Sequence, residues 1–281
     1  MLEPIALPRP SVVALAASFL LFGPALAGCQ GEKSAPEPNP EPVQTQTPVV
    51  AVGPAPTLDR AGLLQAMDVA ASAYAAGRDV GGASLAGRRF VVRQAFGCAG
   101  ATPPPADTAT GDGLAAWSWG EQRRSLKLTL APGDWTASPL VAGGAETWET
   151  VEGFWLARPW LRADGCPGVQ GDPLASGPAT PSPQTMGLAA VFEEDGPRTG
   201  RRNGRAYDFI VRGEDGQQAV APGEGYRLVL EGRMVAFADG RAIRCRAANP
   251  DQRPVCIGAV QLDRVAFEDA QGKMLSEWRA G

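Results

Sequence analysis

Beyond residue 77 the chain consists of short apolar or alternating runs, and glycine, proline, asparagine or aspartate interrupts each of them. With 35 glycines and 26 prolines in 281 residues, long helices cannot dominate the fold. The pattern therefore predicts a mainly β domain, built as a sandwich or barrel, with the C-terminal strands compatible with a small OB-like barrel. The expected strands are 88–96, 114–119, 123–130, 146–157, 187–193, 205–212, 225–238, 241–247, 255–268 and 273–279.

One helix precedes these runs. Leu63, Met67, Ala70 and Tyr74 recur at the helical period and predict one apolar face that packs on the core. Thr57 is placed to cap the first turn, and a glycine at 77 supplies a C-terminal stop. The folded domain is expected to span 57–281.

The first residues form an apolar run of a different kind. The segment 12–22 is almost entirely apolar, but it is shorter than the roughly 20 residues that a membrane-spanning helix needs. Its length suits the h-region of a secretory signal peptide, about 7–15 residues. Leu26, Ala27, Gly28 and Cys29 follow in register. These four residues resemble the lipobox of bacterial lipoproteins.

That resemblance implies that residues 1–28 are cleaved and that Cys29 carries a diacylglycerol and an N-acyl chain. Two or more acyl chains make a stable membrane anchor. Gln30, rather than aspartate, follows the cysteine. In this family that favours the outer membrane, facing the periplasm, over the inner membrane.

Residues 29–56 are expected to form a tether. Prolines at 36, 38, 40 and 42 alternate with polar residues and block regular hydrogen bonding. Such a sequence favours extended polyproline II geometry, which would hold the domain away from the membrane surface.

Four cysteines remain for the folded domain: Cys98, Cys166, Cys245 and Cys256. An even number in an exported chain predicts disulfides, and four cysteines allow three pairings. The short spacing of Cys245 and Cys256 suits one bridge, which leaves Cys98 with Cys166. A zinc site and free thiols are the alternatives, but no CxxC knuckle is present.

The chain contains no histidine, which excludes histidine-based triads, bases and zinc sites. No recognisable catalytic motif replaces them, and neither a metal nor a cofactor is expected beyond the acyl chains. A net charge of −4 gives no basic footprint for nucleic acid. The acidic cluster 193–195 is the remaining route to carboxylate-dependent hydrolysis of cell-wall sugars, although a surface turn also explains it.

Two groups of residues are candidates for binding. Six of the seven tryptophans lie within 117–160, and exposed indoles can stack on sugars or anchor protein partners. The run 198–205 holds the one cluster of arginines, which could bind an anionic glycan or lipid headgroup. The candidate binding residues are Trp117, Trp119, Trp155, Trp160, Arg201 and Arg202.

These observations predict a lipid-anchored envelope protein without catalytic activity, which acts as an interaction or structural module for an envelope protein. A module that binds cell-wall glycan through the tryptophan cluster is the first alternative. A carboxylate-dependent cell-wall hydrolase is the second.

Overall fold

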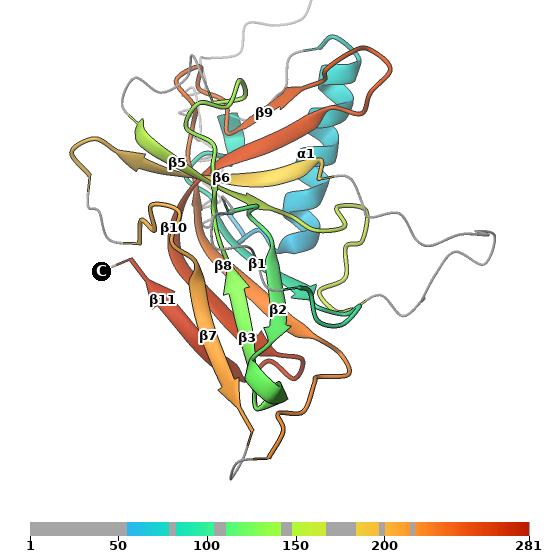
Figure 1. The fold of residues 1–281 in the computed structure, drawn as a ribbon. Coiled ribbons are helices and arrows are strands. Elements are labelled where there is room, and N and C mark those ends of the chain that lie inside the picture. The colour runs from blue at the N-terminus through green and yellow to red at the C-terminus, as the bar shows by residue number, and fades with distance from the viewer. Residues whose placement is uncertain are drawn as a thin grey trace, which may run out of the picture. The chain divides into compact units, whose positions relative to one another are not determined.

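A computed structural model describes residues 55–78, 83–103, 111–141, 148–166, 184–196, 200–213 and 217–280. The predicted signal peptide, Cys29 and nearly all of the tether therefore lie outside the described residues. The described chain is mainly β, with one α-helix and two sheets, as the sequence pattern predicts (Figure 1). Two 3-10 turns, Ala83–Leu85 and Glu121–Arg123, complete the elements.

Helix α1 spans Arg60–Ala75 and begins later than predicted. Its N-cap is Asp59, whose side chain accepts the backbone N–H of Gly62 at 2.7 Å. Thr57 is not the cap, because Leu58 forms an extended bridge to Phe90 and the chain cannot turn into a helix before it. At the other end Gly77 has a φ of 64°, which makes it the expected stop.

The larger sheet contains eight strands and the smaller sheet three. Six strands of the larger sheet follow the order β1 (Arg89–Phe96), β8 (Tyr226–Met234), β10 (Val255–Asp269), β6 (Met186–Glu193), β5 (Trp148–Trp155) and β4 (Gly133–Asp134). Both β9 (Ile243–Arg246) and β11 (Met274–Arg279) also pair with β10. The smaller sheet has the order β2 (Ala115–Trp119), β3 (Ser125–Leu130) and β7 (Tyr207–Arg212).

Strand β10 organises the larger sheet because it has 15 residues and two neighbours on each side. Its first half pairs with β9 and, in parallel, with β6, whereas its second half pairs with β8 and β11. A bulge between Leu262 and Arg264 interrupts the ladder between β10 and β8. The C-terminal strands therefore belong to the larger sheet, and the expected OB-like barrel is wrong.

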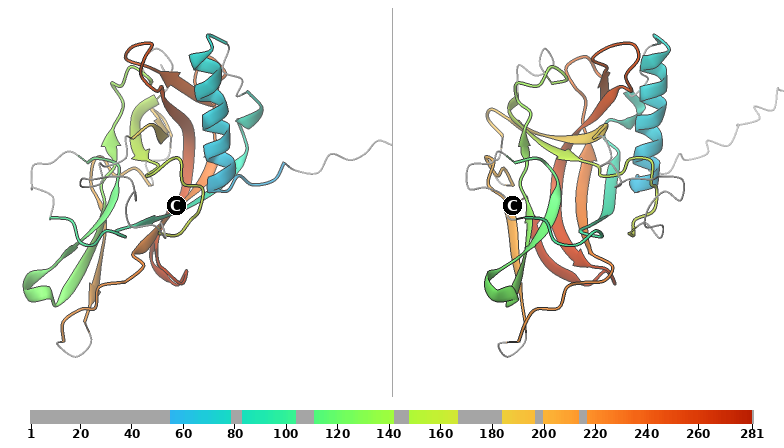
Figure 2. Two further views of the ribbon diagram at one scale, coloured as in Figure 1. Left: turned by 90° about the vertical axis from the view of Figure 1, so that its right-hand side faces the viewer. Right: turned by 45° about the vertical axis from the view of Figure 1, so that its right-hand side comes forward.

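One buried cluster joins α1, the larger sheet and the smaller sheet. Leu63, Met67 and Ala70 of the predicted apolar face are buried in this cluster together with Leu64. Tyr74, the last residue of that face, is 36% exposed and is not part of the core, because it lies at the end of α1. Leu126 and Leu128 contribute from β3, whose alternating burial leaves Lys127 paired with Asp208 at the surface. Figures 1 and 2 show α1 near one end of the larger sheet and β2, β3 and β7 near the other.

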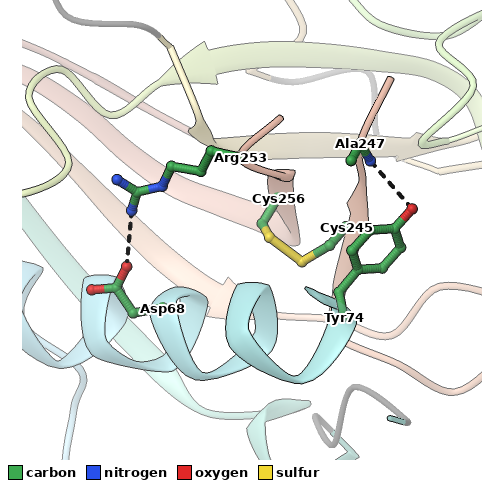
Figure 3. Close-up of a disulfide and its surroundings, with 6 residues drawn as sticks. All are labelled: Asp68, Tyr74, Cys245, Ala247, Arg253 and Cys256. Atoms are coloured by element: carbon green, nitrogen blue, oxygen red, sulfur yellow. Dashed lines mark hydrogen bonds and ion pairs between the residues drawn. A yellow bond between two sulfur atoms is a disulfide. The ribbon is translucent and has the colours of Figure 1, made fainter. Parts of the chain in front are cut away.

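The two expected disulfides are present, with the expected pairing. Cys98 bonds to Cys166, and Cys245 bonds to Cys256. Cys245 and Cys256 lie directly opposite each other on β9 and β10. Figure 3 shows α1 below this pair of strands, and two residues of α1 contact the chain next to the disulfide. Arg253 pairs with Asp68 at 3.2 Å, and the N–H of Ala247 donates to the Tyr74 hydroxyl.

Candidate functional site

The two halves of β10 create a fork in the larger sheet. On one edge of β10 the ladder with β6 ends at Val260 and Ala190, and the ladder with β11 begins at Arg264 and Arg279. Between these pairs β6 and β11 diverge. A pocket of about 340 Å³ lies at this fork, within the usual size range of small-ligand sites.

The pocket combines positive charge with an aromatic and aliphatic wall. Its charged residues are five arginines and one aspartate: Arg201, Arg202, Arg205, Arg264, Arg279 and Asp263. Its apolar wall consists of Phe192, Tyr207, Leu262, Val265 and Trp278. Tyr207 and Trp278 contact each other edge to face, with ring centroids 5.2 Å apart.

The segment 200–205 carries three of these arginines and is held by a buried carboxylate. Glu152, on β5, is 2% exposed, and its Oε1 accepts the backbone N–H groups of Arg202 and Asn203 at 2.7 Å each. Burial raises the pKa of Glu152, whereas these two hydrogen bonds and the nearby arginines lower it by less. The positive φ of Asn203 and Gly204 lets the segment turn tightly around this anchor.

Arg201 is used to hold the segment in place. Its guanidinium pairs with Glu149 at 3.0 Å and donates to the Thr150 hydroxyl. Its side chain is 13% exposed. Arg201 therefore connects the segment to β5, and most of its charge is already balanced.

Arg202 and Arg205 are differently placed. The Arg202 guanidinium lies 4.8 Å from the Tyr207 ring centroid and donates to the Ala206 carbonyl. The Nε of Arg205 donates to the Arg202 carbonyl at 3.3 Å. Within the described ranges neither guanidinium has a carboxylate partner. They are the arginines of the pocket that form no ion pair among the described residues, while Glu152 interacts electrostatically with Arg202. Guanidinium groups match carboxylate and phosphate geometry well.

Arg264 and Arg279 lie directly opposite each other on β10 and β11, where like charges would repel. Glu277 relieves this repulsion because it pairs with Arg264 at 2.9 Å and with Arg279 at 3.1 Å. Glu231 pairs with Arg264 from the other side. Burial lowers the pKa of Arg264, but the hydrogen bonds and charges of Glu277 and Glu231 outweigh burial and raise it. Arg264 and Arg279 therefore line the pocket, but the carboxylates of Glu277 and Glu231 balance their positive charge.

The predicted binding residues separate into two groups. Arg201 and Arg202 both reach the pocket, as part of the expected arginine cluster. The four tryptophans do not line it. Trp117 is 3% exposed and donates to the Gly97 carbonyl, so it is core and cannot stack on a ligand.

The other three tryptophans occupy different environments. Trp119 packs edge to face on Trp117, and Trp155 packs on Trp135 with ring centroids 4.7 Å apart. Trp160 is 58% exposed, on the loop that Arg60 holds through the carbonyls of 157, 158 and 161. The predicted tryptophan cluster is therefore dispersed, and only Trp160 presents a largely exposed indole.

Arg264, Arg279 and Trp278 line the pocket but are not among the predicted binding residues. Trp278 is the one tryptophan outside the 117–160 cluster, and nothing local marks it. The arginines at 264 and 279 are spread through strand-like runs whose register is set only by pairing with β10. Arg205 belongs to the arginine run 198–205, but its place in the pocket depends on the turn at 202–205.

The acidic cluster 193–195 begins at the last residue of β6 and continues into a turn, and all three residues are exposed. Among the described side chains, no group of three or more cysteine, aspartate and glutamate residues is arranged to hold a metal ion. In the same part of the chain, the one α-helix is too short and too polar to cross a membrane.

Comparison of the chain with protein-family models, curated proteins and solved structures finds no significant match. The fold and the site of the described residues can nevertheless be stated together. These residues form a two-sheet β domain with two disulfides, and an arginine-rich pocket lies where β6 and β11 diverge in the larger sheet.

Proposed function

We propose that this chain is a lipid-anchored lipoprotein of the bacterial cell envelope, and that its β domain is a non-catalytic module that binds an anionic ligand. The lipobox-like residues 26–29 and the proline-rich tether support the anchor and an outer-membrane, periplasm-facing location. The two disulfides agree with an oxidising compartment.

One observation supports an anionic ligand. Arg202 and Arg205 lack carboxylate partners within the described residues and line a concave pocket beside Tyr207 and Trp278. A surface arginine is ordinarily surrounded by water. In a concave pocket with aromatic walls, a ligand can displace that water, and the guanidinium group can then bind a carboxylate or phosphate bidentately. An anionic envelope glycan has this chemistry, since its sugar faces also suit aromatic side chains.

Calorimetry on the purified lipidated protein tests the binding proposal, with glucose 6-phosphate and glucose as probes in phosphate-free buffer. We expect glucose 6-phosphate to bind and glucose to bind much more weakly. Arg205→Gln should lower the affinity about tenfold or more, the usual worth of a charge-assisted hydrogen bond. Arg212→Gln is the matched control, because Arg212 is exposed on β7 and does not line the pocket. Equal weak heats from both probes would reject an anion site.

Membrane fractionation tests the anchor independently of the ligand. Wild-type protein should sediment with outer membranes and carry acyl chains on Cys29 by mass spectrometry. Cys29→Ser should abolish the acylation and the mature, cleaved form. An unmodified Cys29 in the mature protein would contradict the anchor, and sedimentation with inner membranes would contradict the proposed location.

A further inference from the structure

Strand β7 lies at one edge of the smaller sheet, on the far side of β3 from β2 (Figure 1). The backbone N–H of Gly213 donates to the Arg124 carbonyl, so these two residues form a hydrogen-bonded pair of the antiparallel ladder between β7 and β3. Hydrogen-bonded and non-hydrogen-bonded pairs alternate along such a ladder. The odd-numbered residues of β7 therefore bond to β3. The even-numbered residues, Asp208, Ile210 and Arg212, direct their backbone groups to the other side, which we call the free edge.

The backbone groups at the free edge have no protein partner. Within the part of the chain that the structure describes, no residue bonds to the backbone N–H or C=O of Asp208, Ile210 or Arg212. Other edge strands are partly covered. Leu58 forms backbone hydrogen bonds along the edge of β1, and Thr102 donates to the edge of β2. The free edge of β7 is therefore an open template for another strand.

The free edge also lacks the features that usually prevent strand addition. Its ladder with β3 is regular, without a bulge, and β7 contains no proline or lysine. The side chains of Asp208, Ile210 and Arg212 all lie on the exposed face of the strand. Ile210, in the middle, is 50% exposed. An apolar side chain flanked by one acid and one base is thus presented beside the unpaired backbone groups.

We propose that two copies of this chain associate by antiparallel pairing of their free edges, with a two-fold axis at Ile210. In this register Ile210 of one copy lies opposite Ile210 of the other. Asp208 of each copy lies opposite Arg212 of the other. All three residues direct their backbone groups to the free edge, so each opposed pair can exchange two backbone hydrogen bonds.

The side chains select this register. Two-fold pairing centred on Asp208 or on Arg212 would place like charges opposite each other, which is unfavourable, whereas the register centred on Ile210 opposes acid and base twice. Arg212 forms no ion pair with any side chain that the structure describes. Asp208 pairs with Lys127 at 3.3 Å, but its side chain is 42% exposed and its carboxylate can accept a second donor.

The proposed interface is isologous, because the same strand of each copy forms it. A strand of six residues buries less surface than a standard protein interface, so we expect a weak, reversible dimer. Asp208, Ile210 and Arg212 do not line the arginine pocket. The inference therefore goes beyond the proposed function and does not depend on it.

Cysteine substitution along β7 tests the register in cells that export the full-length chain. Opposed residues of a hydrogen-bonded antiparallel pair have Cα atoms about 5.5 Å apart, which a disulfide can bridge. Ile210→Cys should therefore give a covalent dimer on a non-reducing gel after mild oxidation. Wild-type protein, whose domain cysteines are already paired, should stay monomeric on the same gel.

The neighbouring positions of the free edge are the matched controls. In the proposed register the residue at 208 or at 212 lies about 14 Å from its own copy. Asp208→Cys and Arg212→Cys should therefore each cross-link about tenfold less than Ile210→Cys, because a disulfide cannot span that distance. The variant that combines both substitutions should cross-link well, since the two positions oppose each other.

Charge reversal in the Ile210→Cys protein tests the ion pairs. Arg212→Asp should lower the cross-linked fraction about tenfold, because both opposed pairs become pairs of like charge. Asp208→Arg should do the same. Coexpression of these two variants should restore the dimer, since every acid then faces an arginine of the other chain. Arg78→Asp is the control, because it makes the same reversal at an exposed residue beyond α1.

Each outcome supports or overturns the proposal. Equal cross-linking of the three single cysteine variants would indicate random collision and overturn it. Cross-linking of Ile210→Cys that neither charge reversal reduces, or that coexpression fails to restore, would reject this register. Absence of a cross-link in every variant would reject self-association through β7. Circular dichroism of the purified variants verifies that a lost dimer does not reflect a lost fold.

Discussion

The side chain of Glu152 on β5 accepts the backbone N–H of Arg202 at 2.7 Å, beneath the arginine pocket. Through this bond a residue of the larger sheet sets the position of a segment 50 residues away in the sequence. The same oxygen also accepts the N–H of Asn203. The arginine side chains can therefore face the pocket because their backbone is held from the other side by a buried acceptor.

Replacement of Glu152 by alanine should disorder the arginine segment. The change leaves two N–H groups without an acceptor, at a cost of about 1–3 kcal/mol each when they stay buried. We expect a lower free energy of unfolding in urea and weaker binding of anionic probes. Glu194→Ala is the control, because Glu194 lies in the exposed turn after β6. An unchanged affinity in Glu152→Ala would show that this anchor does not position the arginines.

The raised pKa of Glu152 predicts a pH dependence of stability. A carboxyl group whose folded pKa is raised stabilises the fold below its ordinary value, 4.5, and this contribution is lost as the pH rises through the folded pKa. The wild type should therefore lose stability relative to Glu152→Gln as the pH rises from 4.5. Urea titrations of both proteins across this range measure the difference. A difference that grows in favour of the wild type with rising pH would have the wrong sign.

Gly97 should tolerate no side chain. A Cβ at this position would lie 2.1 Å from Cδ1 of Trp117, and its φ of 70° already disfavours other residues. Gly97→Ala should cost about 2–5 kcal/mol, since it adds overpacking to backbone strain. Gly87→Ala isolates the backbone contribution, because Gly87 has a φ of 83° with open space around its Cβ position. Equal losses of unfolding free energy in the two variants would mean that Trp117 moves aside freely.

The two disulfides should differ in their effect on stability. Cys98 and Cys166 are 68 residues apart, whereas Cys245 and Cys256 are 11 apart. Because the longer loop restricts the unfolded chain more, the double serine variant of the first pair should lose about 4 kcal/mol and that of the second about 3 kcal/mol. Denaturation under non-reducing conditions measures both. The reverse order would indicate that packing of the β9–β10 hairpin against α1 outweighs chain entropy.

Much of the fold follows from short-range patterns. The stripe of Leu63, Met67, Ala70 and Tyr74 predicts the helix, because side chains three and four residues apart share one side of a helix. Its first three residues are buried as predicted. The alternation in β3 predicts which leucines are buried. Gly240 and Gly272 mark turns because their positive φ suits glycine.

The predicted tryptophan site and the predicted C-terminal barrel are both wrong because local patterns do not determine which distant segments of the chain pack together. Alternation places Trp117 and Trp119 on one face of a strand, but it does not say which face the rest of the chain covers. The expected C-terminal barrel failed because β10 pairs with β6 and β8, and pairing between strands from separate parts of the chain has no local signal.

The sequence by itself determined the helix, most strand positions, the even set of cysteines and the cluster that contains Arg201 and Arg202. It also carries the lipobox-like residues from which we propose the anchor. The tertiary structure alone decided that Arg264, Arg279 and Trp278 join that cluster at one pocket. The reason is geometric: β6 and β11 share one edge of β10, and the site exists only where they part.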